Sequence, residues 1–216
     1  MFAKKEAMPT ATAIQPTARP AAFPAALTNG ANSPVITWED FEREYLSRED
    51  EYKYEWVEGR VVKTKRSMHK TQLYILLNLL RHFESLRIEG KVFGQLVPEP
   101  DLFFLANHRR PDFAWLTDQQ IYALADPAAY EVPAFIIEVV STNDQIREMK
   151  DKMKNYRDAG VQVVWHIHPI HQEVDIYSGK NLSKSKVCTG RQICSAAPVL
   201  PAFAMSVSAI FKKQIQ

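Results

Sequence analysis

The sequence predicts a single α/β domain in which a mixed central sheet is flanked by helices and carries additional β-hairpins. The length of 216 residues, with 46% apolar and 24% charged content, is typical of one globular domain with a sizeable core. Residues 134–140 form a continuous apolar run between Pro133 and Ser141, which is the pattern of a strand covered on both faces. Segments with helical and strand periods also alternate along the chain, as in α/β domains.

Residues 1–34 are expected to be a flexible leader that precedes a domain spanning residues 35–212. The leader contains five of the 13 prolines, is rich in alanine and shows no helical or strand period. Its prolines interrupt every apolar stretch that could serve as the core of a signal peptide.

Charge and cysteine content limit the possible functions. A formal net charge of +2 is too small to indicate a polyanionic partner, so any contact with nucleic acid depends on local basic clusters. Cys188 and Cys194 lack the spacing of a metal site, which favours reduced thiols in an intracellular protein. No apolar run reaches the ~18 residues of a membrane span. The predicted location is therefore the cytoplasm, with no membrane partner.

The first elements of the domain are a short helix, a hairpin and a long helix. Thr37 is expected to cap a helix over residues 37–46, and residues 52–63 predict a hairpin that turns at Glu58 and Gly59. A long helix is then expected over residues 69–86. Its predicted apolar stripe consists of Leu73, Leu76, Leu77, Leu80 and Phe83.

The remaining elements are mostly strands. Strands are expected at residues 91–97, 102–105 and 112–116, as a meander whose last two strands are joined by a turn-like segment. The elements expected after it are a minor helix at 118–125, a strand at 134–140, a helix at 143–159, a hairpin of strands at 161–169 and 173–179, weaker strands at 184–189 and 192–195, and a terminal helix at 206–211.

Two of the predicted strands each contain one acid that is unusual among its neighbours. Asp112 starts one strand, and Glu138 interrupts the apolar run of another. Alternation places Glu138 on the same face as Ile136 and Val140. Burial of a polar group without a partner costs on the order of 2–7 kcal/mol even when the group is neutral. A positively charged group is therefore expected beside Glu138.

The helix that follows Glu138 offers three lysines. Its predicted apolar stripe is Ile146, Met149, Met153 and Tyr156. Lys150 and Lys152 flank opposite sides of this stripe, whereas Lys154 is turned toward water. Helical phase alone does not choose between Lys150 and Lys152.

Two carboxylates on adjacent strands with a nearby ammonium suit metal-assisted hydrolysis of a phosphodiester. Asp112 and Glu138 would supply hard oxygen ligands for Mg²⁺ or Mn²⁺. Lys152 would stabilise the developing negative charge, with a proton loosened by desolvation. Glu55 could add a further carboxylate, and His69 could contact phosphate or assist proton transfer.

The sequence resembles the Uma-two (Uma2) family of restriction-endonuclease-like proteins, a branch of the PD-(D/E)XK nuclease superfamily. The resemblance covers most of residues 36–211. It is carried, in order, by Thr37, Trp38, Phe41, the run YEWVEG at 54–59, His69, the run RPD at 110–112, IEVVS at 137–141, Lys152, Met153, Tyr156, AGV at 159–161, Trp165, Leu200, Pro201 and Phe203.

This resemblance implies a restriction-endonuclease-like fold and a Mg²⁺-dependent endonuclease that acts on DNA in the cytoplasm. It also implies Asp112, Glu138 and Val139 as metal ligands, with Asp112 and Glu138 as the acidic pair. Glu55 and His69 are the further catalytic candidates. The implied partner is DNA, and the oligomeric state, including a homodimer, stays open.

The superfamily lysine departs from its usual position, two residues after the acid, which is Val140 here. In the family pattern a lysine on the following helix takes over, and this favours Lys152 over Lys150. Two other departures, Thr142 in place of a common proline and His168 in place of a common aspartate, concern the shape of loops.

Four basic residues around the start of the long helix are candidates for binding a nucleic-acid backbone, although such residues also form ordinary solvated edges. They are Lys63, Lys65, Arg66 and Lys70. The main alternative function is a catalytically inactive nuclease-fold protein that binds nucleic acid or a partner. A hydrolase of another phosphate ester is more distant. His166, His168 and His171 suggest a zinc site, but the sequence indicates no further fixed ligand.

Overall fold

A six-stranded mixed sheet forms the centre of the protein in the computed structural model, which describes residues 35–65, 73–105, 107–140 and 146–213. The strand order is β10-β9-β8-β7-β6-β3. Its strands are β3 (Gln95–Pro98), β6 (Phe113–Leu116), β7 (Phe135–Val139), β8 (Val163–His168), β9 (Glu173–Ser178) and β10 (Lys184–Thr189). The predicted leader, residues 1–34, lies outside the described residues, as do His69, Arg66 and Lys70.

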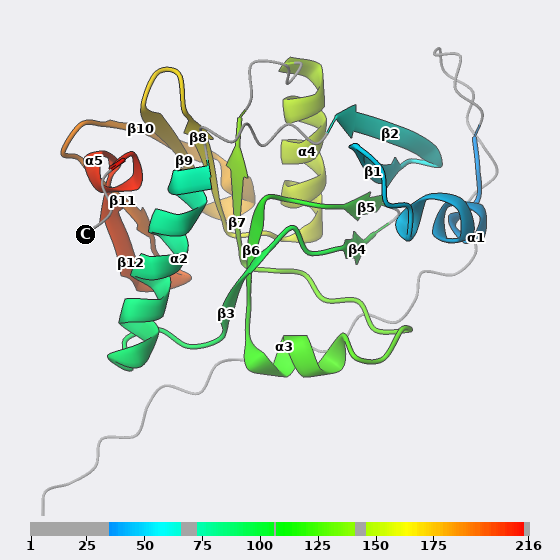
Figure 1. Ribbon diagram of the computed structural model, residues 1–216, viewed down its shortest axis with the longest axis horizontal. Helices are drawn as coiled ribbons and strands as arrows, with labels where there is room; N and C mark the ends of the chain where they lie inside the picture. Colours follow the sequence, from blue (N-terminus) through cyan, green and yellow to red (C-terminus); the bar gives the residue numbers. More distant parts are fainter. Residues whose placement is uncertain (1–34, 66–72, 106, 141–145, 214–216) are drawn as a thin grey trace, which may run out of the picture.

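The middle of this sheet is buried on both faces. Every residue of β6 is buried, and so are the first four residues of β7. β7 pairs parallel with β8 and antiparallel with β6. Since helices cover both faces of the sheet, the continuous apolar run at 134–140 forms a central strand, as predicted (Figure 1).

A second sheet has the order β2-β1-β5-β4. It consists of β1 (Tyr52–Val57), β2 (Arg60–Lys65), β4 (Leu102–Phe104) and β5 (Asn107–Arg109). The predicted hairpin at 52–63 is confirmed as β1 and β2. The prediction of a simple meander is wrong, because the chain leaves the central sheet after β3 and returns only at β6.

Strand β5 falls where the sequence predicts a turn. All three of its residues are polar, yet all three are buried, and they pair with β1 and β4. Polar strand residues lack the apolar pattern from which strands are predicted, and here their partners come from distant parts of the chain. Strand β12 (Leu200–Ser206) was also missed, and it pairs with β11 (Ile193–Ala196).

The helices and turns are α1 (Trp38–Phe41), the π-helix η1 (Glu42–Leu46), α2 (Leu73–Ile88), α3 (Asp118–Ala123), α4 (Ile146–Ala159), the 3₁₀ turn η3 (Lys180–Leu182) and α5 (Val207–Ile210). The Thr37 side chain caps α1 by accepting a hydrogen bond from the Asp40 N–H, as predicted. Within the described residues, none of the helices has the length and apolar character needed to cross a membrane.

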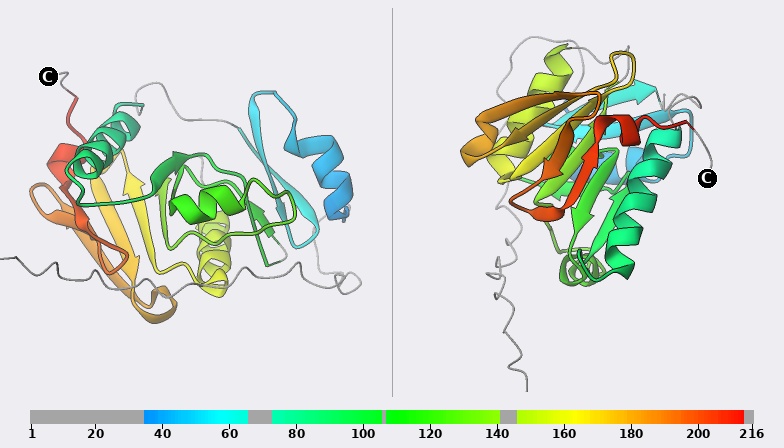
Figure 2. Two further views of the ribbon diagram at one scale, coloured as in Figure 1. Left: turned by 90° about the horizontal axis from the view of Figure 1, so that it is seen from below. Right: turned by 90° about the vertical axis from the view of Figure 1, so that its left-hand side faces the viewer.

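The two faces of the central sheet carry different cores (Figure 2). Helices α2 and α5 and strand β12 pack on one face, and α4 packs on the other. The buried residues of α2 are Ile75, Leu79, Phe83 and Leu86, whereas Leu73 and Leu77 are about half exposed. The predicted α2 stripe is therefore shifted, because residues 73–80 are almost all apolar and their pattern does not set the phase of the helix.

Helix α4 turns Met153 and Tyr156 toward Ile136 on the sheet, as its pattern predicts. Ile146 was predicted to belong to the same stripe, but it is 76% exposed. Asn155 was not expected in the interior, and it is 5% exposed. The face that α4 presents to β7 therefore includes polar as well as apolar side chains.

Candidate active site

Asp112 and Glu138 lie side by side at the ends of two paired strands. Phe113 of β6 is the register partner of Ile137 of β7, so Asp112, the residue just before β6, is opposite Glu138. The row continues from Glu138 to His166 on β8 and then to Asp175 on β9. Four titratable residues therefore follow one line across the sheet.

Glu138 is held by two side chains from α4. The Nζ atom of Lys152 lies 3.3 Å from both carboxylate oxygens of Glu138. The Tyr156 hydroxyl donates a short hydrogen bond to the Oε1 atom. The cation that the sequence predicts beside Glu138 is thus Lys152. Since Lys152 and Tyr156 are one helical turn apart, both reach the same carboxylate.

Asp112 is bound through its Oδ2 atom, which accepts a hydrogen bond of 2.6 Å from the Val139 N–H. Its Oδ1 atom lies 3.9 Å from the Nζ atom of Lys53. The Val140 N–H points the other way, toward Ile167 on β8. Because the N–H and C=O of one strand residue point to the same side, the Val139 carbonyl also faces the Asp112 side.

Glu55 belongs to a buried network behind these acids. Its Oε2 atom accepts a hydrogen bond of 2.8 Å from Arg109, and its Oε1 atom accepts one of 2.9 Å from the Arg110 N–H. Arg109 also donates to the Asn155 amide oxygen through Nε at 2.9 Å. Both oxygens of Glu55 are therefore engaged by the chain itself, and Glu55 anchors the strand that leads to Asp112.

Three members of this site were missed by the sequence analysis, namely Lys53, Arg109 and Asn155. Lys53 and Glu55 are two residues apart on β1, so they share the strand face opposite to Tyr54 and Trp56, which pack in a separate aromatic core. That alternation is a signal that could have placed Lys53 beside Glu55. The polar run before Asp112 gave no such signal for Arg109, because it has the composition of a turn.

The two central acids have opposite pKa shifts. Burial and the neighbouring Glu138 charge raise the pKa of Asp112 to about 6, against the opposing effect of Lys53. Burial alone would also raise the pKa of Glu138, but Lys152 and Lys53 lower it below its usual value. Glu55 has a pKa of about 2, because Lys152 and Arg109 outweigh its burial. Of the three acids in the metal-free site, Asp112 is therefore the one that is protonated most readily.

Lys152 keeps its proton firmly. Burial acts to lower its pKa, but Glu138, Glu55 and Asp112 raise it well above the ordinary value. The expectation that desolvation loosens this proton is therefore wrong, since three nearby carboxylates stabilise the ammonium. Lys152 is a fixed positive charge, suited to stabilising a negative charge but not to accepting a proton.

The other two lysines of α4 lie away from the acids. Lys150 is exposed, and the Lys154 side chain is 62% exposed with its Nζ atom 3.9 Å from Glu58. Helical phase left Lys150 and Lys152 as alternatives. Of these two lysines, Lys152 is the one that contacts Glu138 among the described atoms.

A model of the Uma2 family, whose description reads "Putative restriction endonuclease", matches residues 38–208. That span covers most of the chain and includes each acid and lysine of the site. The chain belongs to the Uma2 family.

A solved structure supports the fold of this Uma2 protein. It is described as "a putative nuclease belonging to DUF820 from Anabaena variabilis ATCC 29413". The two chains are 17% identical and superpose with a TM-score of 0.66, over 82% of this chain and 97% of the other. The predicted restriction-endonuclease-like α/β fold is confirmed. A search among curated proteins gave no significant match.

The residues of the Uma2 site fit a small divalent cation bound mostly by solvent or substrate oxygens. Asp112 and Glu138 are adjacent. Among the described residues, the cation nearest to the Oδ1 atom of Asp112 is Lys53, at 3.9 Å. Mg²⁺ is commonly held by one or two carboxylates, several waters and a substrate phosphate. A fully protein-bound cage is not indicated, because no group of three or more His, Cys, Asp or Glu within the described ranges is arranged to hold a metal ion.

The three histidines suggested as a zinc site have different surroundings. His166 and His168 share a strand face, as predicted, with ring centroids 6.5 Å apart. His168 bonds to Asp175 at 3.0 Å. His166 is buried, and its Nε2 atom has no hydrogen-bond partner among the residues that the structure describes. Burial lowers its pKa to about 4. His171 lies in the exposed turn between β8 and β9.

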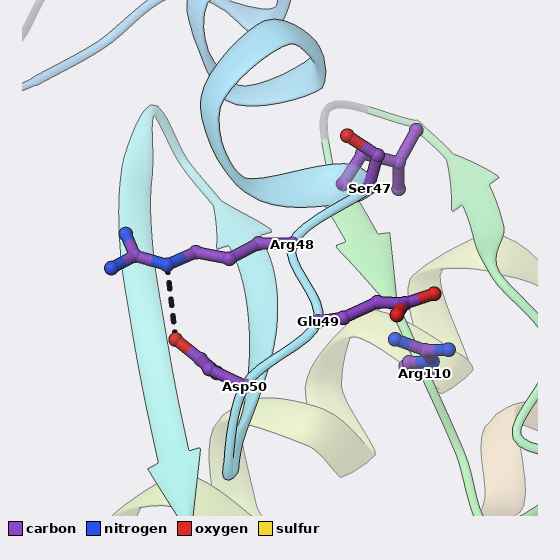
Figure 3. Close-up of a pocket in the computed structure, with 6 residues that line it drawn as sticks. Ser47, Arg48, Glu49, Asp50 and Arg110 are labelled. Atoms are coloured by element: carbon purple, nitrogen blue, oxygen red, sulfur yellow. Dashed lines mark ion pairs between the residues drawn. The ribbon is translucent and has the colours of Figure 1, made fainter.

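A surface pocket of about 490 Å³ is shown in Figure 3, and its lining does not include Asp112, Glu138 or Lys152. It is lined by Leu46, Ser47, Arg48, Glu49, Asp50 and Arg110. Arg48 forms an ion pair of 2.9 Å with Asp50. The lining contains two basic and two acidic residues, so its charge favours neither an anion nor a cation.

Two of the four predicted backbone-binding residues lie on β2 within the described part of the chain. Lys63 is exposed and its Nζ atom lies 3.6 Å from the centre of the Tyr52 ring. Lys65 ends the strand. Arg66, Lys70 and the catalytic candidate His69 lie outside the described residues.

Proposed function

We propose that this Uma2 protein is a Mg²⁺- or Mn²⁺-dependent endonuclease that hydrolyses phosphodiester bonds in DNA in the cytoplasm. The observation that carries the proposal is the arrangement of three groups from different elements: Asp112 before β6 lies opposite Glu138 on β7, and Lys152 on α4 contacts Glu138. Two adjacent carboxylates with a permanent ammonium beside them match what phosphodiester hydrolysis needs from a protein.

Asp112, Glu138 and the Val139 carbonyl would hold the divalent cation. When bound there, the cation would supply Lewis-acid polarisation of the scissile phosphate. The Val139 N–H fixes the orientation of Asp112, and the Tyr156 hydroxyl fixes that of Glu138. Because both carboxylates are held in advance, little reorganisation would be needed when the ligand arrives.

Lys152 would stabilise the negative charge that develops on the phosphate during the reaction. Its ammonium is almost buried, with 12% of the side chain exposed, and a charge in such a place acts more strongly than one in water. Its raised pKa keeps it charged across the physiological range, so the proton on the attacking water must leave by another route. His69 is a candidate for that role.

Glu55 supports the site from behind. Its carboxylate holds the Arg110 N–H, two residues before Asp112, and is itself neutralised by Arg109. We therefore propose Glu55 as a positioning residue rather than a metal ligand. The DNA backbone would be contacted by the four basic residues at and after the end of β2, namely Lys63, Lys65, Arg66 and Lys70.

The test is cleavage of supercoiled plasmid and of duplex and single-stranded oligonucleotides in Mg²⁺ or Mn²⁺, with Asp112→Ala as the control. Cleavage by the wild type that is lost in the variant supports the proposal. If both proteins bind DNA alike and neither cuts it, the chain is a nuclease-fold binding protein. Preference for small phosphate esters would indicate a different hydrolase. Sedimentation of the same samples tests for a homodimer.

A further inference from the structure

The charges of the described site balance without any metal. Glu55, Asp112 and Glu138 each form an ion pair with a different cation: Arg109 pairs with Glu55 at 2.8 Å, Lys152 with Glu138 at 3.3 Å and Lys53 with Asp112 at 3.9 Å. A divalent cation on Asp112 and Glu138 would therefore add to a neutral cluster. At least one of the existing cations must lose part of its stabilisation when the ion binds.

Of the three cations, Lys53 is the one that can most easily give up its ion pair when a divalent cation binds. Its distance of 3.9 Å from Asp112 is an ion-pair separation but too long for a hydrogen bond. The side chains of Lys53 and Asp112 are 12% and 16% exposed, whereas those of Arg109 and Glu55 are 1% and 3% exposed. The ion pair between Lys53 and Asp112 is therefore partly accessible to solvent, whereas the ion pair between Arg109 and Glu55 is buried.

Lys53 also differs from Lys152 in what fixes it. Lys152 contacts both oxygens of Glu138, and the same carboxylate is held by Tyr156. Lys53 comes from β1 of the second sheet, and its ammonium is carried on a flexible four-carbon stem. It can therefore turn from Asp112 to a nearby anion without a change in the backbone.

Resting on the proposed function, we infer that Lys53 is a second catalytic lysine that exchanges partners. In the metal-free protein it neutralises Asp112 and so competes with the divalent cation for that carboxylate. When the cation binds, Lys53 is released and pairs with the phosphate of the DNA substrate. The negative phosphate then replaces the lost carboxylate as its counter-ion.

This exchange predicts two effects of opposite sign for Lys53→Met. Removal of the competing charge should tighten Mn²⁺ binding in the absence of DNA, by about three- to tenfold. Removal of the phosphate partner should lower the cleavage rate at saturating Mn²⁺ by about tenfold or more. A lysine that acts only as a counter-ion of Asp112 would not combine these effects, because losing it would tighten Mn²⁺ binding but leave the cleavage rate at saturating Mn²⁺ unchanged.

The experiment combines calorimetric titration of Mn²⁺ into DNA-free protein with single-turnover cleavage at saturating Mn²⁺. Lys53→Arg should behave close to the wild type in the titration and keep part of the rate. Lys53→Gln serves as a second neutral variant if Lys53→Met does not fold. The matched control is Lys91→Met, which removes a lysine from a surface ion pair with Glu89 and should change neither measurement.

The nuclease function and the role of Lys53 can be overturned separately. If the wild type does not cleave any DNA, the proposed function is overturned, and the role of Lys53 toward phosphate with it. The titration still decides whether Lys53 competes for Asp112. If the wild type cleaves and Lys53→Met cleaves equally fast, or binds Mn²⁺ no more tightly, the inference about Lys53 is wrong while the nuclease function stands.

Discussion

The Nζ atom of Lys152 lies 3.3 Å from both carboxylate oxygens of Glu138, although the two residues are 14 positions apart and belong to different elements. β7 ends just after Glu138, and α4 returns across the same face of the sheet. The result is a buried acid with its own fixed cation. This relationship makes Lys152 the natural focus of a first mutational test.

Lys152→Met should reduce the cleavage rate by about 10²- to 10³-fold while leaving DNA affinity nearly intact, because its charge is proposed to act in the transition state. Single-turnover kinetics and a binding assay in EDTA separate the two effects. Lys150→Met and Lys154→Met are matched controls from exposed positions of the same helix and should cut at close to the wild-type rate. Normal cleavage by Lys152→Met would remove this lysine from the mechanism.

Asp112→Asn and Glu138→Gln should both weaken binding of Mn²⁺, since each removes a charged oxygen ligand that the ion needs. Calorimetric titration of the two variants and the wild type measures this. Added Mg²⁺ should also raise the melting temperature of the wild type more than that of either variant. Unchanged affinity in both variants would show that the ion, if it binds, binds elsewhere.

Asp112 should cost the metal-free protein stability at neutral pH. Its folded pKa of about 6 exceeds the value of 3.8 for an unperturbed carboxyl, so the folded state holds more protons between these values and loses stability as pH rises through this window. Asp112→Asn should therefore be more stable than the wild type above pH 6, by up to about 3 kcal/mol. The difference should vanish below about pH 4.

Urea denaturation at pH 8 and pH 4, with EDTA present, measures this effect of Asp112. Glu138→Gln is the matched control, because the pKa of Glu138 is lowered by Lys152 and Lys53 and its charge is stabilising. It should destabilise the protein at pH 8, opposite in sign to Asp112→Asn. The same sign for both variants would contradict the charge distribution described for the site.

Arg109→Met should destabilise the protein by about 3–5 kcal/mol, because it leaves the Glu55 carboxylate buried without its cation. Chemical denaturation provides the measurement. The double variant Arg109→Met with Glu55→Gln should recover part of the loss, since it removes the uncompensated charge. If the double variant is no better than the single one, the cost comes from packing and not from the unpaired carboxylate.

Substitution of the four basic residues at and after the end of β2 by alanine should weaken DNA binding about equally for all sequences. They are Lys63, Lys65, Arg66 and Lys70. Contacts to phosphates release counter-ions, so the variant should also show a shallower dependence of affinity on salt. Fluorescence anisotropy across a salt series tests both effects. Wild-type affinity with an unchanged salt slope would identify these residues as an ordinary solvated edge.

Much of the fold could be predicted from local patterns. The apolar run at 134–140, the capping by Thr37 and the hairpin turn at Glu58 and Gly59 each have a cause within a few residues, and all three appear in the structure. The prediction of a cation beside Glu138 also succeeded, because the cost of burying an unpaired acid holds in any fold. The choice of Lys152 over Lys150 needed the family resemblance.

The polar part of the site could not be predicted in this way. Arg109 lies on a strand without apolar alternation, and its partners Glu55 and Asn155 are 54 and 46 residues away in the sequence. The phase of α2 was missed for the opposite reason, since too many of its residues are apolar for the pattern to indicate one face.

Residue type and order alone indicate that Asp112 begins one apolar strand, that Glu138 interrupts another and that a cation must lie near Glu138. The tertiary structure brings two further cations, Lys53 and Arg109, to the site, because both belong to a second sheet whose pairing is set by long-range contacts. It also decided the proton state of Lys152, since the pKa of a buried ammonium depends on how many carboxylates surround it. Residue type determines which groups can ionise, and the electrostatic field of residues distant in the sequence determines the charge state that each group takes.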